Sequence, residues 1–257
     1  MSTFAIAGAK GGVGKTTTSL NLAASLAPVA RSVVVEFDLA MANAVDFLAI
    51  DCDPELDATL HDVLADTATV RNATYEAPGG FDVVPSGTTL DGYTETNPDR
   101  LVPVVKALAS TYDVVLLDVG AGLSRETLLP LAVADETVLV STPRVASVRD
   151  AQKTIELTER VGGSVAGVVF VKSGTGNAPD PNRIASFLGV DLLGHVPEDP
   201  AVPASQDVGQ PVVVYAPDSP ASVAYAEVVR RLVVRRAERS PDASTAAADG
   251  GRRERGG

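Results

Sequence analysis

Short runs of apolar residues alternate along this chain with longer segments in which apolar positions recur at helical spacing. The runs predict strands at residues 3–7, 32–37, 81–85, 113–118, 136–141, 165–171 and 192–196. The amphipathic segments predict helices at residues 15–27, 59–65, 100–110, 124–132, 145–161, 182–188 and 219–239. Several runs are apolar throughout, as strands are when helices cover both faces of a parallel sheet. The alternation therefore predicts a doubly wound, mostly parallel α/β sheet.

Polar, turn-rich stretches at residues 77–80 and 87–98 predict loops, and neither an internal repeat nor a linker interrupts the pattern. We therefore expect a single domain over residues 1–239. Residues 240–257 are small and polar and contain no large apolar side chain, so they predict a disordered tail.

The composition places limits on the compartment. The chain has 257 residues, is 45% hydrophobic and contains no apolar stretch near 18 residues, so it can bury a core and predicts no membrane-spanning helix. A basic leader is absent at the N-terminus, and the lone Cys52 cannot form an internal disulfide. We expect a cytoplasmic protein, with peripheral contact to a membrane left open.

The charge is strongly acidic and unevenly distributed. The net charge is −12 with only five lysines, which favours a halophilic, archaeal source as a hypothesis. Residues 223–257 contribute +3 from eight arginines and five acidic residues, which leaves −15 for residues 1–222. An acidic body argues against broad non-specific binding to DNA.

Residues 7–18 read AGAKGGVGKTTT and lie between the first predicted strand and the first predicted helix. Glycines at such a turn let backbone N–H groups approach an anion, so the segment predicts a phosphate-binding cradle. Lys15 would reach the β- and γ-phosphates, and the Thr16 hydroxyl would hold Mg²⁺. The strict P-loop pattern asks for glycine where the chain has Ala9, and a dinucleotide pattern fails at Thr17. The expected cradle comprises Gly11, Gly12, Val13, Gly14, Lys15, Thr16 and Thr17.

Acidic residues stand at the ends of two predicted strands. The second strand carries Glu36 and Asp38 on either side of Phe37, so both carboxylates can point to the same side. The fourth strand delivers Asp118 after four apolar residues, which is the Walker B arrangement for a carboxylate near Mg²⁺. Carboxyl ends of parallel strands face the ligand crevice, although a plain strand-end role remains the alternative for Asp38 and Asp118.

The segment KGGVGKTT at residues 10–17 resembles the deviant Walker A motif of the MinD/ParA family of P-loop ATPases. The resemblance implies that Lys10 reaches across a dimer interface to the partner's ATP. A positive charge brought to the γ-phosphate in this way would stabilise the negative charge that develops during transfer.

The segment EFDLAMAN at residues 36–43 is similar to the first switch of that family, which is usually Asp-x-Asp followed by Gly and Asn. The resemblance implies that Asp38 orients the attacking water and that Asn43 serves the nucleotide site. Glu36 and Ala40 depart from the pattern, which leaves the metal-linked geometry at Glu36 open.

The segment DVGAG at residues 118–122 resembles the second switch, Asp-x-Pro-x-Gly. Gly122 would place an N–H group near the γ-phosphate, and Gly120 replaces the proline, which suggests a more mobile loop. The segment HVPEDPAV at residues 195–202 resembles the stretch whose backbone borders adenine, which implicates Pro197 and Asp199. The family often reads adenine with Asn-Arg where this chain has Val-Lys at residues 171–172, so ATP rather than GTP rests on the resemblance alone.

The resemblance thus implies a P-loop ATPase that binds ATP and Mg²⁺, hydrolyses ATP slowly and forms a homodimer around two nucleotides. It would position a cellular structure together with an unidentified partner protein. The expected catalytic residues are Lys10, Lys15 and Asp38. The expected metal-linked residues are Thr16, Asp38 and Asp118.

Two other functions remain open. A ParA-type protein that partitions DNA needs a basic dimer surface, which the acidic body does not suggest. A non-hydrolysing ATP-binding scaffold is suggested by Glu36, Ala40 and Gly120. The last predicted helix carries an apolar stripe beside arginine pairs, which favours docking on the fold over contact with a membrane surface.

Overall fold

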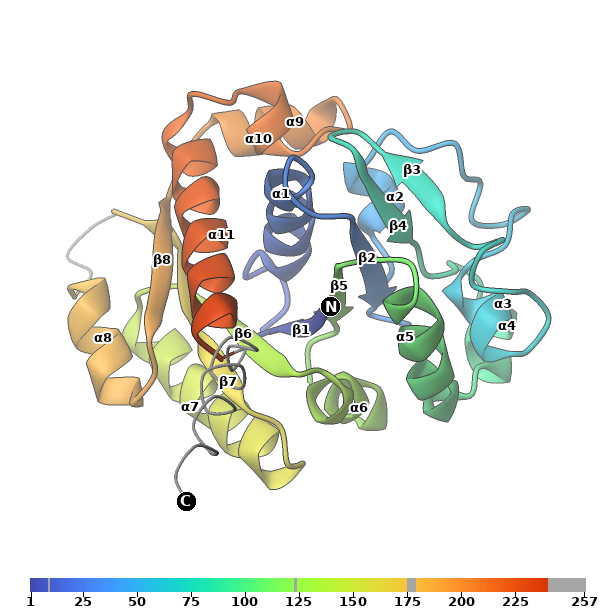
Figure 1. Ribbon diagram of the computed structural model, residues 1–257, viewed down its shortest axis with the longest axis horizontal. Coiled ribbons are helices and arrows are strands. Elements are labelled where there is room, and N and C mark those ends of the chain that lie inside the picture. The colour runs from blue at the N-terminus through green and yellow to red at the C-terminus, as the bar shows by residue number, and fades with distance from the viewer. Residues whose placement is uncertain (9, 123, 175–178, 240–257) are drawn as a thin grey trace, which may run out of the picture.

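One sheet organises the part of the chain that the computed structural model describes, which is residues 1–8, 10–122, 124–174 and 179–239. Its strands lie in the order β3-β4-β2-β5-β1-β6-β7-β8, and all neighbours are parallel except β3, which is antiparallel to β4 (Figure 1). The strands are β1 (Ser2–Ala7), β2 (Ser32–Phe37), β3 (Tyr75–Ala77), β4 (Phe81–Val84), β5 (Val114–Val119), β6 (Glu136–Ser141), β7 (Val165–Ser173) and β8 (Leu192–Pro197).

The connections between strands are mostly helical. The helices are α1 (Lys15–Leu26), α2 (Ala44–Phe47), α3 (Leu60–Leu64), α4 (Leu90–Glu95), η1 (Pro98–Arg100), α5 (Leu101–Ala109), α6 (Arg125–Val133), α7 (Val145–Arg160), α8 (Pro181–Leu188), α9 (Ala201–Asp207), α10 (Val212–Tyr215) and α11 (Pro220–Arg239). None of those in the described ranges combines the length and the apolar character that a bilayer crossing needs.

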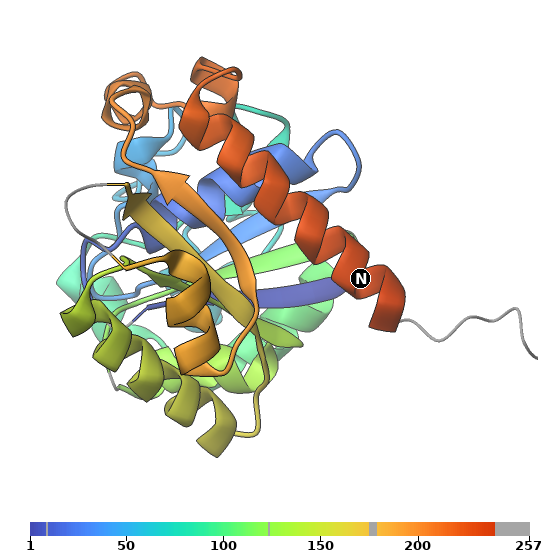
Figure 2. The same cartoon turned by 90° about the vertical axis from the view of Figure 1, so that its left-hand side faces the viewer.

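Both faces of the sheet are buried, because side chains alternate along each strand. On β5, Leu116 packs into a core with α1 and α11, whereas Val115 and Leu117 face α3, α5 and α6. At the far end of the sheet, α7 and α8 cover the face opposite α11 (Figure 2). This two-sided burial explains the uniformly apolar strand segments and confirms the predicted doubly wound α/β fold.

All seven predicted strands are present, but several short elements were not predicted. β3, α2, α4, α9 and α10 are additional, and the predicted loop at 87–98 is wrong in part because it contains α4. Thr89 caps this helix, because its Oγ1 accepts a hydrogen bond from Gly92 N. The polar composition of the stretch did not indicate this cap. The predicted tail at 240–257 lies outside the described residues.

The sheet order brings three loops together at the carboxyl ends of the strands. β2, β5 and β1 are consecutive in the sheet and parallel, so the segments after Phe37, Val119 and Ala7 leave from the same side. In a sheet of this kind ligands bind outside the carboxyl ends of the strands. The three motifs singled out in the sequence therefore converge at this edge.

Candidate functional site

The glycine-rich loop after β1 ends at the uncapped start of α1. Gly14 is the N-cap residue with φ of 108°, a left-handed conformation that side chains rarely adopt. No side chain in the described part of the chain caps the helix, and its first turn holds no acidic residue. Its free N–H groups and the positive end of its dipole therefore make a site for an anion.

Lys15 adds a buried positive charge beside these N–H groups. Its residue is only 7% exposed. Among the described residues its ammonium makes one long hydrogen bond, 3.5 Å to the carbonyl oxygen of Lys10. A buried ammonium has three donors, so most of its capacity remains for a ligand such as a phosphate.

Asp118 lies beneath the loop at the end of β5 and is held by two hydroxyl groups. Ser19 Oγ donates to Asp118 Oδ1 over 3.0 Å, and the Thr16 hydroxyl also donates to this carboxylate. Burial raises the pKa of Asp118 to about 6, while Thr16 and the charge of Lys15 lower it. A hydroxyl beside a carboxylate offers the hard oxygen ligands that Mg²⁺ prefers, so these residues fit the ion.

The described residues contain no group of three or more His, Cys, Asp or Glu side chains arranged to hold a metal by themselves. Mg²⁺ in nucleotide sites uses one or two protein oxygens together with phosphates and waters. The donor set around Thr16 and Asp118 matches that usage.

Asp38 stands at the rim of the same site, immediately after β2, and is half-buried. Burial raises the pKa of this carboxyl, and the charge of Lys15 opposes that shift. Its carboxylate lies so close to β5 that a Cβ atom on Gly120 would stand 2.9 Å from Asp38 Oδ1. The glycine that replaces proline therefore has a packing role that the sequence did not reveal.

Glu36 does not share the cavity with Asp38, contrary to the expectation that both carboxylates point to one site. Its residue is fully buried, and Oε1 accepts hydrogen bonds from Asn43 N and Ala44 N at 2.6 and 2.7 Å. Oε2 accepts from Ser86 N at 2.9 Å. Burial raises the pKa of Glu36 to about 7, although the three N–H donors lower it. Both carboxylate oxygens are thus bonded to backbone.

A cavity of about 820 Å³ opens over the phosphate loop, large enough for a nucleotide. Its walls bring together most predicted site residues, namely Gly11, Gly12, Val13, Gly14, Lys15, Thr16, Thr17, Asp38, Asn43, Pro197 and Asp199. Lys10, Asp118 and Gly122 do not line it, although Ala121 does. Asn43 Oδ1 is buried at this wall without a hydrogen-bond partner among the described residues, which suits a ligand contact.

Asp199 has a structural role in addition to its place on the cavity wall. Its carboxylate accepts from Ala221 N at 3.0 Å and from Ala201 N at 2.9 Å. These bonds hold the starts of α11 and α9 together, and they lower the pKa of Asp199. The resemblance alone did not indicate this contact.

Among the residues of the cavity wall that were not predicted, Lys172, Gln206 and Tyr225 carry polar side chains. Lys172 Nζ donates to the carbonyl oxygen of Gly12 over 3.1 Å, and Lys172 has a positive φ of 52° at an irregular point of β7. Gln206 Nε2 donates to Thr17 Oγ1, and Tyr225 lies at the wall from α11. Of these three, only Lys172 could have been suspected from the sequence, because it stands where the MinD/ParA family often has the Asn-Arg pair that reads adenine.

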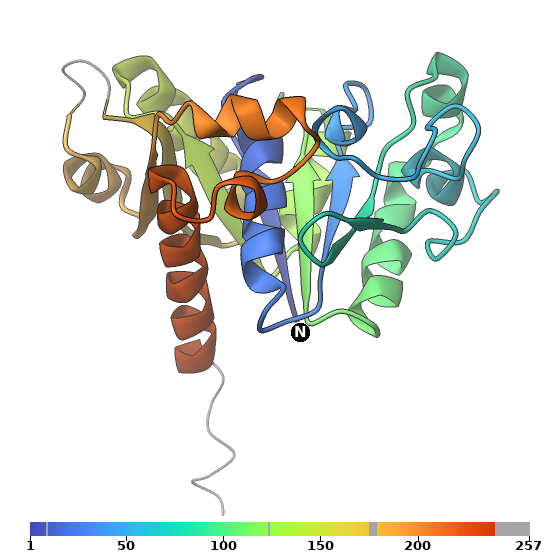
Figure 3. The same cartoon turned by 90° about the horizontal axis from the view of Figure 1, so that it is seen from above.

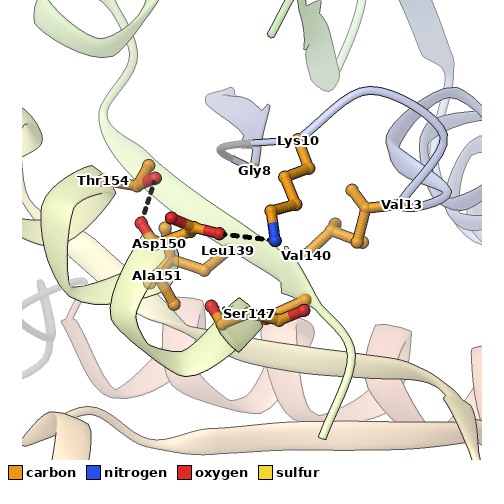
Figure 4. A pocket seen from close by; sticks show the side chains of 10 residues that line it. Gly8, Lys10, Val13, Leu139, Val140, Ser147, Asp150, Ala151 and Thr154 are labelled. Atoms are coloured by element: carbon orange, nitrogen blue, oxygen red, sulfur yellow. Dashed lines mark hydrogen bonds and ion pairs between the residues drawn. The ribbon is translucent and has the colours of Figure 1, made fainter. Parts of the chain in front are cut away.

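Lys10 does not line this cavity, and its side chain points toward Asp150 of α7 (Figure 4). Its ammonium forms an ion pair of 2.9 Å with Asp150, and the two side chains are 54% and 23% exposed. The pair lines a small cleft between the phosphate loop and α7 with Val13, Ser147 and Thr154. Within one chain, therefore, Lys10 lines this cleft and Lys15 lines the larger cavity.

The cradle, its buried lysine and the carboxylate of the neighbouring strand define the class: the chain is a P-loop nucleotide-binding protein. A family model described as an AAA domain matches residues 1–165, and one described as NUBPL iron-transfer P-loop NTPase matches residues 105–233. The chain belongs to the MinD/ParA family of P-loop NTPases, as the sequence motifs predicted.

Individual relatives agree with this assignment over most of the chain. An ATP-binding protein of Methanocaldococcus jannaschii is 37% identical, over 90% of this chain and 87% of its own length. The cell division ATPase MinD of Pyrococcus furiosus superposes with a TM-score of 0.86 at 30% identity, over 91% of this chain and 99% of that one. MinD of Pyrococcus horikoshii, solved with Mg-ADP, gives 0.83 at 29% identity, over 90% and 95% of the two chains.

Proposed function

We propose that this protein binds ATP with Mg²⁺ and hydrolyses it slowly as a homodimeric switch of MinD type. The observation that carries the proposal is the uncapped start of α1 beside Lys15, a buried cation with donors to spare. The relatives support the choice of ligand, since one is an ATP-binding protein and another was solved with Mg-ADP.

Each residue has a role that follows from its position. The loop N–H groups and Lys15 would hold the β- and γ-phosphates, and Thr16 with Asp118 would hold Mg²⁺, which neutralises phosphate charge. Asp38, at the rim and next to Lys15, would orient the attacking water. Catalysis of this kind depends on positioning and charge neutralisation, so we expect slow turnover.

Dimerisation would bring Lys10 to the partner's nucleotide. In the single chain Lys10 is paired with Asp150 on the surface, and exposed ion pairs contribute only about 0–1 kcal/mol. Exchanging this partner for a triphosphate of higher charge is therefore favourable. We propose that the dimer acts on a cellular structure through a second protein whose identity is open.

The decisive experiment is single-turnover hydrolysis by Asp38→Ala. We expect the rate to fall about 10²-fold while the Kd for ATP stays within about threefold, because Lys15 and the loop N–H groups are untouched. Titration with a fluorescent ATP analogue supplies the binding control. Equal rates in wild type and variant would remove Asp38 from the mechanism and favour the scaffold function.

Salt-dependent binding of the ATP form to DNA would instead favour a partitioning function. The acidic body gives no support to that outcome.

A further inference from the structure

Glu36 is a buried carboxylate whose hydrogen bonds all lead to loops around the cavity. It stands one residue before the end of β2, directly across from Asp118 in the register with β5. Val35 and Phe37, its chain neighbours, pack into the core on the other face of the sheet. The sheet therefore holds the backbone of Glu36, and the side chain lies on the face opposite to Val35 and Phe37.

The three hydrogen bonds of Glu36 link segments that are far apart along the chain. Oε1 bonds the backbone N–H groups of Asn43 and Ala44, which close the loop between β2 and α2. Oε2 bonds Ser86 N, just beyond β4. Bonds from N–H groups to a buried carboxylate are about twice as strong as neutral ones, so this contact is a firm attachment.

The attached loop carries residues of the cavity wall. Residues 38–43 run from Asp38 to Asn43, and Asp38, Ala40, Met41 and Asn43 all line the cavity. A second side chain holds the start of the same loop, since His61 Nε2 lies 3.0 Å from the carbonyl oxygen of Leu39. The loop is thus held at both ends by buried groups.

Reach explains why this position holds glutamate. The bonds run to residues 43 and 44 on one side and to residue 86 on the other, at 2.6–2.9 Å. The MinD/ParA family usually has aspartate at this position. Aspartate is one methylene shorter, so it would leave one of these two segments without its hydrogen bond to the carboxylate. Because Glu36 does not line the cavity and both its oxygens are bonded to backbone, a metal-linked role does not fit it.

We infer that Glu36 is a positioning residue that holds loop 38–44 so that Asp38 faces the attacking water. The inference rests on the proposed hydrolysis. It assigns to this chain a loop anchor in place of the first aspartate of the switch. The predicted consequence is a separation of binding from turnover, because the anchor supports Asp38 and leaves Lys15 untouched.

The test combines kinetics with amide hydrogen exchange on the full chain. Glu36→Gln replaces one of the two acceptor oxygens by an NH2 group that cannot accept, so one of the bonded segments loses its acceptor. We therefore expect single-turnover hydrolysis to fall at least about tenfold with the Kd for ATP within about threefold. Exchange should accelerate at least about tenfold on the side that faces the new NH2 group, either at residue 86 or at residues 43 and 44. Glu36→Asp keeps the charge but loses the reach, and we expect it not to restore the rate. If Glu36→Gln fails to fold, the same two measurements on Glu36→Asp test the inference.

Asp180→Asn is the matched control, because Asp180 caps α8 by accepting from Asn182 N and does not line the cavity. We expect it to leave rate and exchange at residues 43, 44 and 86 unchanged. A wild-type rate in Glu36→Asp, or unchanged exchange in Glu36→Gln, would overturn the anchor. Faster exchange with unaltered hydrolysis would overturn its link to Asp38. Absence of hydrolysis in wild type would overturn the proposed function, while exchange would still decide the anchoring.

Discussion

A missing side chain at Gly120 determines how closely Asp38 can approach β5. A Cβ atom there would lie 2.9 Å from Asp38 Oδ1 and 3.3 Å from its Cα, closer than such atoms normally come. The residue has no positive φ, so its effect is one of space and not of backbone conformation. Gly120 therefore sets the position of the carboxylate that we assign to the attacking water.

Gly120→Ala should displace Asp38 while leaving the phosphate loop intact. Misplacement of a catalytic group by a fraction of an ångström to 1 Å lowers rates by about ten- to a hundredfold, so we expect a loss of this size in single-turnover hydrolysis. The Kd for ATP should stay within about threefold. A variant with an unaltered rate would mean that the position of Asp38 does not limit turnover.

Among the secondary-structure elements, α9 and α11 show how a wall of the cavity is assembled. Asp199 accepts one backbone N–H from each of them, and Gln206 of α9 also bonds Thr17 of α1. Tyr225 of α11 lies 3.5 Å from the Thr18 hydroxyl. This wall is thus tied directly to the helix that begins at the phosphate loop.

Asp199→Asn should destabilise the protein in a pH-dependent way. The amide keeps one acceptor oxygen and loses the charge, so we expect about 1.5–3 kcal/mol less stability at pH 7. The pKa of Asp199 is lowered in the folded state, so its contribution is present above about pH 4 and is lost as the pH falls through the folded value. The difference between variant and wild type should therefore narrow below about pH 4.

Urea denaturation at several pH values measures this difference. Asp207→Asn is the control, since Asp207 ends the same helix and is exposed. A stability gap of equal size at all pH values would contradict a charge-dependent role for Asp199.

The sequence predicted the long elements and missed most of the short ones for a physical reason. Strands such as β5 can be predicted from sequence because burial on both faces requires a continuous apolar run. Helices of four to seven residues such as α2, α9 and α10 depend on tertiary contacts, like the hydrogen bond that Gln206 of α9 donates to Thr17 of α1.

The residues of the site also divide into those that local sequence predicts and those that depend on distant contacts. The phosphate loop and Asp118 were predicted because their residues are adjacent in sequence to the turn or strand that positions them. Glu36 was misjudged because its partners are seven, eight and fifty residues away. Lys172 contacts Gly12 across 160 residues, so no local pattern could predict that bond.

At the scale of the whole molecule, the two lysines of the phosphate loop serve different surfaces. Lys15 is buried beneath the cavity, whereas Lys10 lies on the surface in an ion pair with Asp150. A charge held outside its own cavity can act on a second copy of the chain.

Lys10→Ala should bind ATP but fail to dimerise. We expect a Kd within about threefold of wild type, because Lys15 and the loop N–H groups remain. Size-exclusion chromatography with light scattering, run with ATP and Mg²⁺ in Asp38→Ala and Lys10→Ala/Asp38→Ala, measures the association without turnover. Normal ATP-dependent dimers of the double variant would contradict the role of Lys10.

The net charge of −12 should make stability depend on salt. Self-repulsion is screened as the Debye length falls from about 10 Å at 0.1 M to about 3 Å at 1 M, so we expect the Tm to rise over this range. Replacing exposed Asp51, Glu55 and Asp91 by their amides should reduce that rise. A Tm that is equal in dilute buffer and in high salt would contradict the halophilic hypothesis.

The direction of α11 determines where a fusion partner or a surface tether can be attached without reaching the nucleotide site. The helix starts at the cavity wall and runs for 20 residues, about 30 Å, toward the opposite edge of the sheet. β1 also begins at that edge, so both ends of the described chain lie there (Figure 3). A fluorescent fusion or a surface tether at the N-terminus would stand clear of the nucleotide, and protein immobilised there should still exchange it freely.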